Sequence, residues 1–423
     1  MENFQRHLEV AKAFSPSAPI DDKSLFAGRI QQITAILTAV AQKGQHAIIY
    51  GERGVGKTSL ANVIHDFVSA QGGDRVRVAK VNGDASVTFP KLWRNVFRQL
   101  PIPRMEASAG FKDSKKSTIV RLDTGIDETC GPEDVRFLLE QFIGLTVVII
   151  DEVDRIRDQD TKSKLADTIK TLSDHVVNAK IILVGVADSV EQIVAEHRSV
   201  ERALVQVRLP RMSDIEVYET IDKALKSVDM SCVLSVKRQI ARLSQGLPHY
   251  AHLIGQNAAL TAVHAERDYV SGDDVQVAIS SALEKAQQTI RSAYHKATSS
   301  PQENMFPQVL LACALVHRDD MGYFSPGDLR GPMSDIMGRR IQIPQFARHL
   351  KDFCKPSRGA VLTKTGPARR QRFRFSDPLL EPFVVMQGIS KGLITTEMIT
   401  EESPESVVDA HAGDNLAESQ LNR

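Results

Sequence analysis

Cysteine is scarce in this sequence, with four among 423 residues. No two of them have the short spacing that a zinc site or a redox pair requires. We therefore expect reduced thiols, the usual state in a cytosolic protein. The four positions are Cys130, Cys232, Cys313 and Cys354.

Long apolar runs are also missing. The longest is far shorter than the roughly 18 residues that a membrane span requires. Met1 to Pro16 carries charges throughout and lacks the apolar centre of a signal peptide. We therefore expect a soluble, cytoplasmic protein.

The composition is that of an ordinary globular protein, with 42% apolar and 25% charged residues. A chain of this length suits two or three packed units better than one core. The net charge of +1 hides an uneven distribution, because residues 395–423 hold seven acidic residues and one basic one. With few apolar groups as well, this tail (394–423) is expected to be disordered.

The first half of the chain alternates short apolar runs with amphipathic stretches, which predicts an α/β fold with a parallel sheet covered by helices. Two of the runs are continuously apolar, as expected for strands buried on both faces. Between Pro101 and Pro132 the pattern breaks down, which indicates a mobile loop or an insertion. The expected strands are residues 47–50, 76–81, 147–150, 181–184 and 205–209.

A glycine-rich loop follows the first expected strand and precedes an expected helix. Small residues let successive backbone N–H groups face a phosphate, and the N-terminus of the helix adds a favourable dipole. Lys57 would reach the β- and γ-phosphates of ATP, and the Thr58 hydroxyl would ligate Mg²⁺. The residues assigned to the nucleotide are Gly51, Glu52, Arg53, Gly54, Val55, Gly56, Lys57, Thr58 and Ser59.

Two carboxylates, Asp151 and Glu152, stand directly after the strand 147–150. The carboxyl ends of parallel strands meet at the edge where open α/β sheets bind ligands. Asp151 would hold the Mg²⁺ shell, and Glu152 would orient or activate the attacking water. The alternative is a pair of solvated turn residues, which the glycine loop upstream makes less favourable.

These motifs together resemble the AAA+ ATPases, in the branch shared by replication-initiator and origin-recognition ATPases and the STAND signalling NTPases. Phe26-Ala27-Gly28-Arg29 is similar to the hydrophobic-Gly-Arg box of that branch, and residues 151–155 are similar to the initiator form of the acidic motif. The resemblance implies a P-loop NTPase core (26–211) after an N-terminal extension (1–25). A helical lid (212–297) and a winged-helix domain (302–393) would follow.

The resemblance also implies further site residues. Asp188 or Ser189, after the strand 181–184, could serve as the polar sensor, or could simply cap a turn. Arg202 would be the arginine finger offered to a neighbouring subunit in an ATP-bridged oligomer, with Arg198 as the other candidate. Either arginine could equally be a solvated helix residue.

The lid segment Gln245-Gly246-Leu247-Pro248-His249-Tyr250 departs from the initiator pattern, which commonly has an arginine there. Gly-Leu-Pro is similar to the lid motif of STAND NTPases, in which the proline packs near the adenine. Pro248 could also be just the first residue of a helix. This departure favours slow, switch-like hydrolysis, and His249 with His252 indicates lid packing rather than a metal site.

The last unit reads as three helices, beginning near residues 308, 325 and 344, followed by strands at 360–363 and 372–375. This order resembles a winged-helix domain, which in initiator ATPases binds duplex DNA. From Arg339 to Arg374 there are eleven lysines or arginines and one acid, Asp352. The candidate reading helix carries Arg348 and Lys351, and the candidate wing carries Lys364, Arg369, Arg370, Arg372 and Arg374.

The sequence therefore predicts an ATPase that binds ATP and Mg²⁺ and engages duplex DNA, in a replication, transposition or defence context. The alternative is a STAND-like regulatory NTPase with slow hydrolysis. In that case the basic face would contact a protein partner, or the acidic tail.

Overall fold

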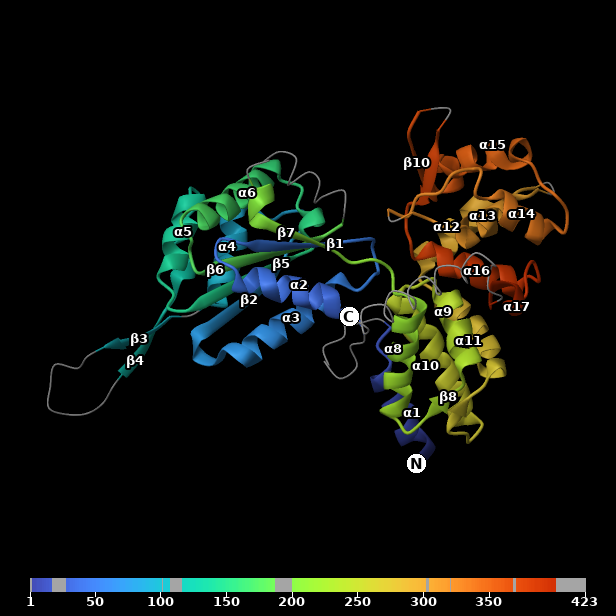
Figure 1. The fold of residues 1–423 in the computed structure, drawn as a ribbon, viewed down its shortest axis with the longest axis horizontal. Helices are drawn as coiled ribbons and strands as arrows, with labels where there is room; N and C mark the ends of the chain where they lie inside the picture. Colours follow the sequence, from blue (N-terminus) through green and yellow to red (C-terminus); the bar gives the residue numbers. More distant parts are fainter. Residues whose placement is uncertain are drawn as a thin grey trace, which may run out of the picture. The chain divides into compact units, whose positions relative to one another are not determined.

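A computed structural model describes residues 2–16, 28–100, 102–106, 116–186, 200–301, 304–319, 321–367 and 370–400. The chain forms two compact units (Figure 1). One comprises Met1–Pro16 with Ser213–Arg423, and the other is Ser17–Met212. Phe26, Ala27 and the tail after Thr400 lie outside the described residues.

The unit Ser17–Met212 is built on a five-stranded sheet in the order β2-β5-β6-β1-β7, in which every pair of neighbours is parallel. This confirms the predicted α/β P-loop NTPase fold. The strands are β1 (His46–Tyr50), β2 (Val76–Asn82), β5 (Leu145–Asp151), β6 (Ala179–Gly185) and β7 (Leu204–Arg208). The helices are α2 (Ile30–Ala41), α3 (Lys57–Gly72), α4 (Phe89–Arg98), α5 (Pro132–Glu140) and α6 (Gln159–Asp174).

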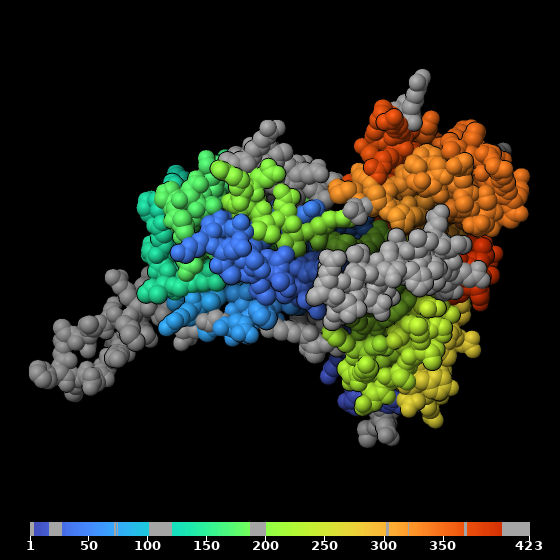
Figure 2. All heavy atoms as spheres, viewed as in Figure 1, coloured from blue at the N-terminus to red at the C-terminus, as the bar shows by residue number. Residues whose placement is uncertain are grey.

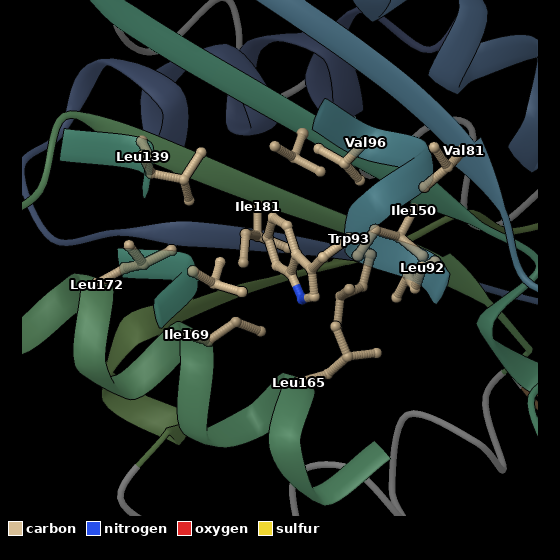
Figure 3. Close-up of a cluster of buried hydrophobic side chains, with 14 of the residues drawn as sticks. Val81, Leu92, Trp93, Val96, Leu139, Ile150, Leu165, Ile169, Leu172 and Ile181 are labelled. Carbon is tan, nitrogen blue, oxygen red and sulfur yellow. The ribbon is translucent and has the colours of Figure 1, made fainter. Parts of the chain in front are cut away.

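One face of this sheet carries an apolar core centred on Trp93 of α4 (Figure 3). Val81, Ile150 and Ile181 point into it from three strands, while α6 closes it from the far side. Side chains alternate between the two faces of a strand, so the residues next to these point to the opposite face, where α3 packs. Lys80 and Asp151 therefore lie on the α3 face.

The segment between α4 and α5, for which the sequence predicts a mobile loop or an insertion, contains regular structure. It contains an antiparallel pair, β3 (Ile102–Glu106) and β4 (Lys116–Val120), which extends away from the sheet in Figure 1. A short 3₁₀ helix, Leu122–Gly125, follows. Because β3 and β4 pair with each other outside the parallel sheet, their sequence need not show the apolar pattern of a core strand.

The other unit begins with a bundle of helices. Ser213 and Glu216 form a capping box at the start of α8 (Asp214–Lys226), because the Glu216 N–H donates to Ser213 Oγ at 3.3 Å and the Ser213 N–H to Glu216 Oε2 at 2.8 Å. The helices are α1 (Glu2–Ala13), α8 (Asp214–Lys226), α9 (Leu234–Ser244), α10 (Pro248–His264), α11 (Gly272–Lys285) and α12 (Gln288–Thr298). The short parallel pair is β8 (Ser231–Cys232) and β9 (Tyr269–Val270).

The N-terminal segment is part of this bundle, since α1 packs against α10 and α8. Phe14 is fully buried against Gly255 of α10, where an added Cβ would lie 2.6 Å from the phenyl ring. Gln256 Nε2 donates to the Phe14 carbonyl at 3.1 Å, and His249 Nδ1 lies 2.5 Å from the Pro16 carbonyl oxygen. His249 thus contacts the N-terminal segment.

The C-terminal part has three helices and then a hairpin, an order that fits a winged helix. Phe324 forms an isolated antiparallel bridge with Phe373 of the hairpin. The second helix begins at Arg330 rather than near Ser325, because residues 325–329 form a turn in which the Ser325 N–H donates to Asp328. The elements are α13 (Phe306–Leu315), α14 (Arg330–Met337), α15 (Ile343–Phe353), β10 (Leu362–Thr365), β11 (Arg372–Phe375), α16 (Leu380–Ser390) and α17 (Thr396–Thr400). No helix among the described residues is both long and apolar enough for a membrane span.

Candidate functional site

The glycine loop joins the end of β1 to the start of α3. Gly54 and Gly56 have φ angles of 86° and 95°, a region that side-chain-bearing residues rarely adopt. A Cβ on Gly51 would lie 2.3 Å from the Leu209 carbonyl oxygen, so only glycine fits there. The Glu52 carboxylate accepts from Arg211 Nε at 2.6 Å. The loop is thus fixed against the chain that follows β7, with the N-terminus of α3 directly behind it.

Lys57 is the first residue of α3, and its ammonium group turns back over the loop. Nζ donates to the carbonyl oxygens of Gly51, at 3.1 Å, and Glu52, at 2.7 Å. Burial lowers the pKa of Lys57 from 10.5 to about 8, against the opposing charges of Asp154, Asp151 and Glu52. A partly buried ammonium held by neutral carbonyls gains from an anionic partner, and phosphate oxygens would supply one.

Asp151 ends β5 with its carboxylate buried. Oδ1 accepts from the Glu152 N–H at 2.8 Å, and Oδ2 lies 3.6 Å from Lys80 Nζ. Glu152 has a left-handed backbone, with φ 56°, and a side chain that is 42% exposed. Its carboxylate pairs with Arg155 at 2.7 Å. The two adjacent carboxylates therefore differ, one buried and fixed, the other at the surface.

The sheet order brings the glycine loop and these carboxylates to one edge. β6 lies between β1 and β5, and all three are parallel, so their carboxyl ends meet at the same edge. Burial lowers the pKa of Lys57, and the charges of Asp154 and Asp151 partly oppose that lowering, which agrees with this proximity. Asp154 also accepts from the Val186 N–H at 3.3 Å, just after β6.

The residues at this edge fit a magnesium nucleotide. Mg²⁺ is bound in proteins by one or two oxygen side chains together with phosphate and water oxygens. Thr58, the second residue of α3, and the buried Asp151 offer such oxygens. The loop and the helix N-terminus would provide a cradle for the phosphates.

The geometry described above does not include several other predicted residues. Asp188, Ser189 and Arg198 lie outside the described residues. Arg202 lies in the 3₁₀ helix η4 (Glu201–Ala203) with its side chain exposed. Pro248 is the first residue of α10, in the other compact unit.

Two residues at the site were not predicted, Lys80 and Arg211. Lys80 is on the edge strand β2, where a lysine normally indicates a solvent-facing position. Arg211 lies in the irregular segment after β7, where no periodic pattern assigns a direction to the side chain. Arg29 of the predicted box is buried, and its Nη2 donates to the Pro210 carbonyl at 2.7 Å.

Residues 40–194 match the family model described as AAA domain. The chain contains an AAA domain. The matched range includes the glycine loop, Lys57 and both carboxylates, which confirms the expected AAA+ core. The AAA domain therefore carries the whole candidate site except Arg29 and Arg211, which flank it in the same compact unit.

Several solved structures are similar to this chain. The Aeropyrum pernix ORC2 protein (ADPNP–ADP complexes) is 18% identical over 88% of this chain and 98% of that one, with a TM-score of 0.46. The Aeropyrum pernix ORC1 protein in complex with DNA is 13% identical over 92% and 98%, with a TM-score of 0.46. The Thermotoga maritima RuvB Holliday junction branch migration motor is 13% identical over 85% and 95%, with a TM-score of 0.44. Likeness at this level carries no functional argument, and the sequence matches no curated protein.

Nucleotide affinity of the AAA domain should fall as the pH rises through about 8. A phosphate bound to Lys57 would favour its charged form, so the complex would hold a proton that the free protein loses near this pKa. The expected slope above that pH is up to about tenfold per unit. Fluorescence titration with a labelled nucleotide measures it. Lys57→Arg keeps its charge and should show no such slope, and a flat wild-type profile would contradict the assignment.

Proposed function

We propose that this protein binds ATP with Mg²⁺ at the carboxyl edge of its AAA domain and hydrolyses the γ-phosphate bond. The observation that carries the proposal is the convergence of the partly buried Lys57 ammonium and the buried Asp151 carboxylate at one sheet edge. A cation for the phosphates and an anion for a metal are the two charges that phosphoryl transfer requires.

Each residue then has a role. Lys57 exchanges its bonds to the Gly51 and Glu52 carbonyls for the β- and γ-phosphate oxygens. Thr58 and Asp151 would hold the Mg²⁺, which would neutralise charge on the phosphates. Glu152 orients the attacking water and accepts its proton, for which its carboxylate must leave Arg155.

A second copy of the chain would complete the site in this proposal. Arg202 is exposed on η4, next to β7, as a finger for a neighbouring subunit must be. A guanidinium placed across the interface would stabilise charge that develops on the γ-phosphate. Arg198 remains the other candidate for this role.

The C-terminal part would engage duplex DNA through its hairpin and the helix before it. Lys364, Arg370, Lys351 and Arg348 are exposed, the last by 91% of its side chain. The β10–β11 hairpin projects from the surface of this unit (Figure 2). Neutralisation of backbone phosphates by such cations supplies most of the affinity of a DNA-binding surface.

Two predicted wing residues are already engaged within the protein. The Arg372 guanidinium pairs with Asp319 and lies 5.3 Å from the centre of the Tyr323 ring. Arg374 lies over the same ring, at 4.8 Å. Arg372 and Arg374 are two residues apart on β11, so both stand on one face of the hairpin. Lys364 pairs with Phe373, which lies between them, so it stands on the other face. We therefore assign the main phosphate contacts to Lys364 and Arg370, and note that Arg369 lies outside the described residues.

The double variant Lys364→Ala/Arg370→Ala should bind duplex DNA about 10-fold or more weakly at moderate salt, with a log–log salt slope shallower by about 2. Fluorescence anisotropy at several salt concentrations measures both quantities. Lys43→Ala/Lys170→Ala removes two exposed lysines from the other unit and should change neither. Equal loss in both variants would refute a specific wing contact. No loss in either would favour the alternative, a switch that binds a protein partner.

A further inference from the structure

Lys80 lies on β2, on the face of the sheet that α3 covers, and only 20% of its side chain is exposed. Its backbone is fixed, because the N–H donates to Gln99 Oε1 at 3.0 Å and the carbonyl accepts from Gln99 Nε2 at 2.8 Å. Its ammonium donates to Asn62 Oδ1 of α3 and lies 3.6 Å from Asp151 Oδ2 of β5. One cation thus connects a helix and two strands.

Asp151 is a buried carboxylate, and such a group needs a partner for each oxygen. The Glu152 N–H bonds to Oδ1, and Lys80 is the cation facing Oδ2. With both oxygens held from different directions, the plane of the carboxylate is set before any metal arrives.

Asn62 follows Thr58 by four residues on α3, so the two side chains share one face of the helix. Lys80 therefore links the helix turn below Thr58 to the carboxylate of Asp151. Those are the two side chains that the proposed function assigns to Mg²⁺.

We infer that Lys80 is a positioning residue that sets Asp151 against Thr58 for magnesium-dependent nucleotide binding. The inference rests on the proposed function, because it needs a nucleotide and its metal at this edge. Lys80 acts through Asp151 and Asn62 rather than by contact with the nucleotide. Outer partners of a metal ligand fix its orientation, and their loss typically weakens metal binding.

The test uses the full chain and measures ATP affinity by calorimetry, at graded Mg²⁺ and in EDTA. Lys80→Met keeps the apolar stem and removes the charge. It should raise the Mg²⁺ concentration for half-maximal binding about 10-fold, within the range for loss of an outer partner of a metal ligand. Affinity in EDTA should stay within about twofold, which also reports on folding. Lys80→Arg should recover most of the loss.

Two further variants distinguish a positioning role of Lys80 from a general loss of structure. Arg77→Met removes a cation from the same strand, next to the Phe142 ring, and should leave the Mg²⁺ dependence unchanged. In an Asp151→Asn background, Lys80→Met should add little, since coupled residues are not additive.

The outcomes are distinct. An unchanged Mg²⁺ dependence in Lys80→Met would overturn the inference while leaving the proposed function intact. A shift to lower Mg²⁺ would also overturn it, because the ammonium would then compete with the metal. A wild-type protein that binds ATP equally with Mg²⁺ and with EDTA, or not at all, would overturn both proposals.

Discussion

Replacement of Lys57 by alanine should weaken ATP binding by at least about 100-fold, because charge-assisted hydrogen bonds to phosphate contribute about 1.5–3 kcal/mol each. In the described part of the chain, Lys57 makes no other interaction of comparable strength. Its ammonium bonds only to carbonyls of its own loop among the contacts described, and burial already disfavours its charge. A phosphate next to Lys57 would offset the unfavourable effect of burial on its charged form.

Isothermal titration with Mg²⁺-ATP measures this loss directly. Lys43→Ala, an exposed lysine just before β1, is the matched control and should bind ATP like the wild type. A thermal melt shows whether Lys57→Ala is folded. Undiminished ATP affinity in a folded Lys57→Ala protein would refute the assigned phosphate site.

Glu152→Gln should keep ATP affinity within about threefold and lower turnover by about 100-fold or more, the range for loss of a general base. The substitution preserves size and removes the charge that accepts the proton. Its left-handed backbone, with φ 56°, is no worse for glutamine than for glutamate. The expected result is therefore loss of turnover without loss of binding.

Phosphate release at saturating ATP measures turnover, and the titration above measures binding. Glu133→Gln on α5 removes another exposed carboxylate that pairs with an arginine, and it should leave turnover unchanged. If Glu152→Gln turned over ATP at the wild-type rate, Glu152 would not be the base.

The strands and the phosphate loop could be predicted because local physics dictates them. Residues 147–150 and 181–184 are continuously apolar, and the structure buries both runs fully, in β5 and β6. Gly54 and Gly56 adopt backbones that require glycine, so their spacing already carries the geometry of the loop.

What the sequence did not reveal depends on contacts between distant segments. Lys80 looks like a solvent-facing edge residue until α3 is placed over it. The N-terminal helix α1 showed no sign of docking on α10, since the fit of Phe14 against Gly255 joins positions far apart in the chain. Helix α16 is apolar on nearly all sides, and its buried Glu381 pairs with Arg318 at 2.9 Å, a partner that no local pattern indicates.

In the basic C-terminal part, too, contacts between distant segments could not be predicted from the sequence. Charge counting selected Arg372 and Arg374 together with Lys364 and Arg370, because all four stand in one basic stretch. Only the fold shows that Asp319 and Tyr323 engage the first two. Composition therefore indicates a basic surface, and the contacts within it decide which cations to test.

Steady-state phosphate release with Mg²⁺-ATP, with and without duplex DNA at low salt, tests the central claim most directly, with Glu152→Gln as the blank. The account predicts a wild-type rate above the blank that rises when DNA is added. A wild-type rate equal to that of the blank under both conditions would contradict it.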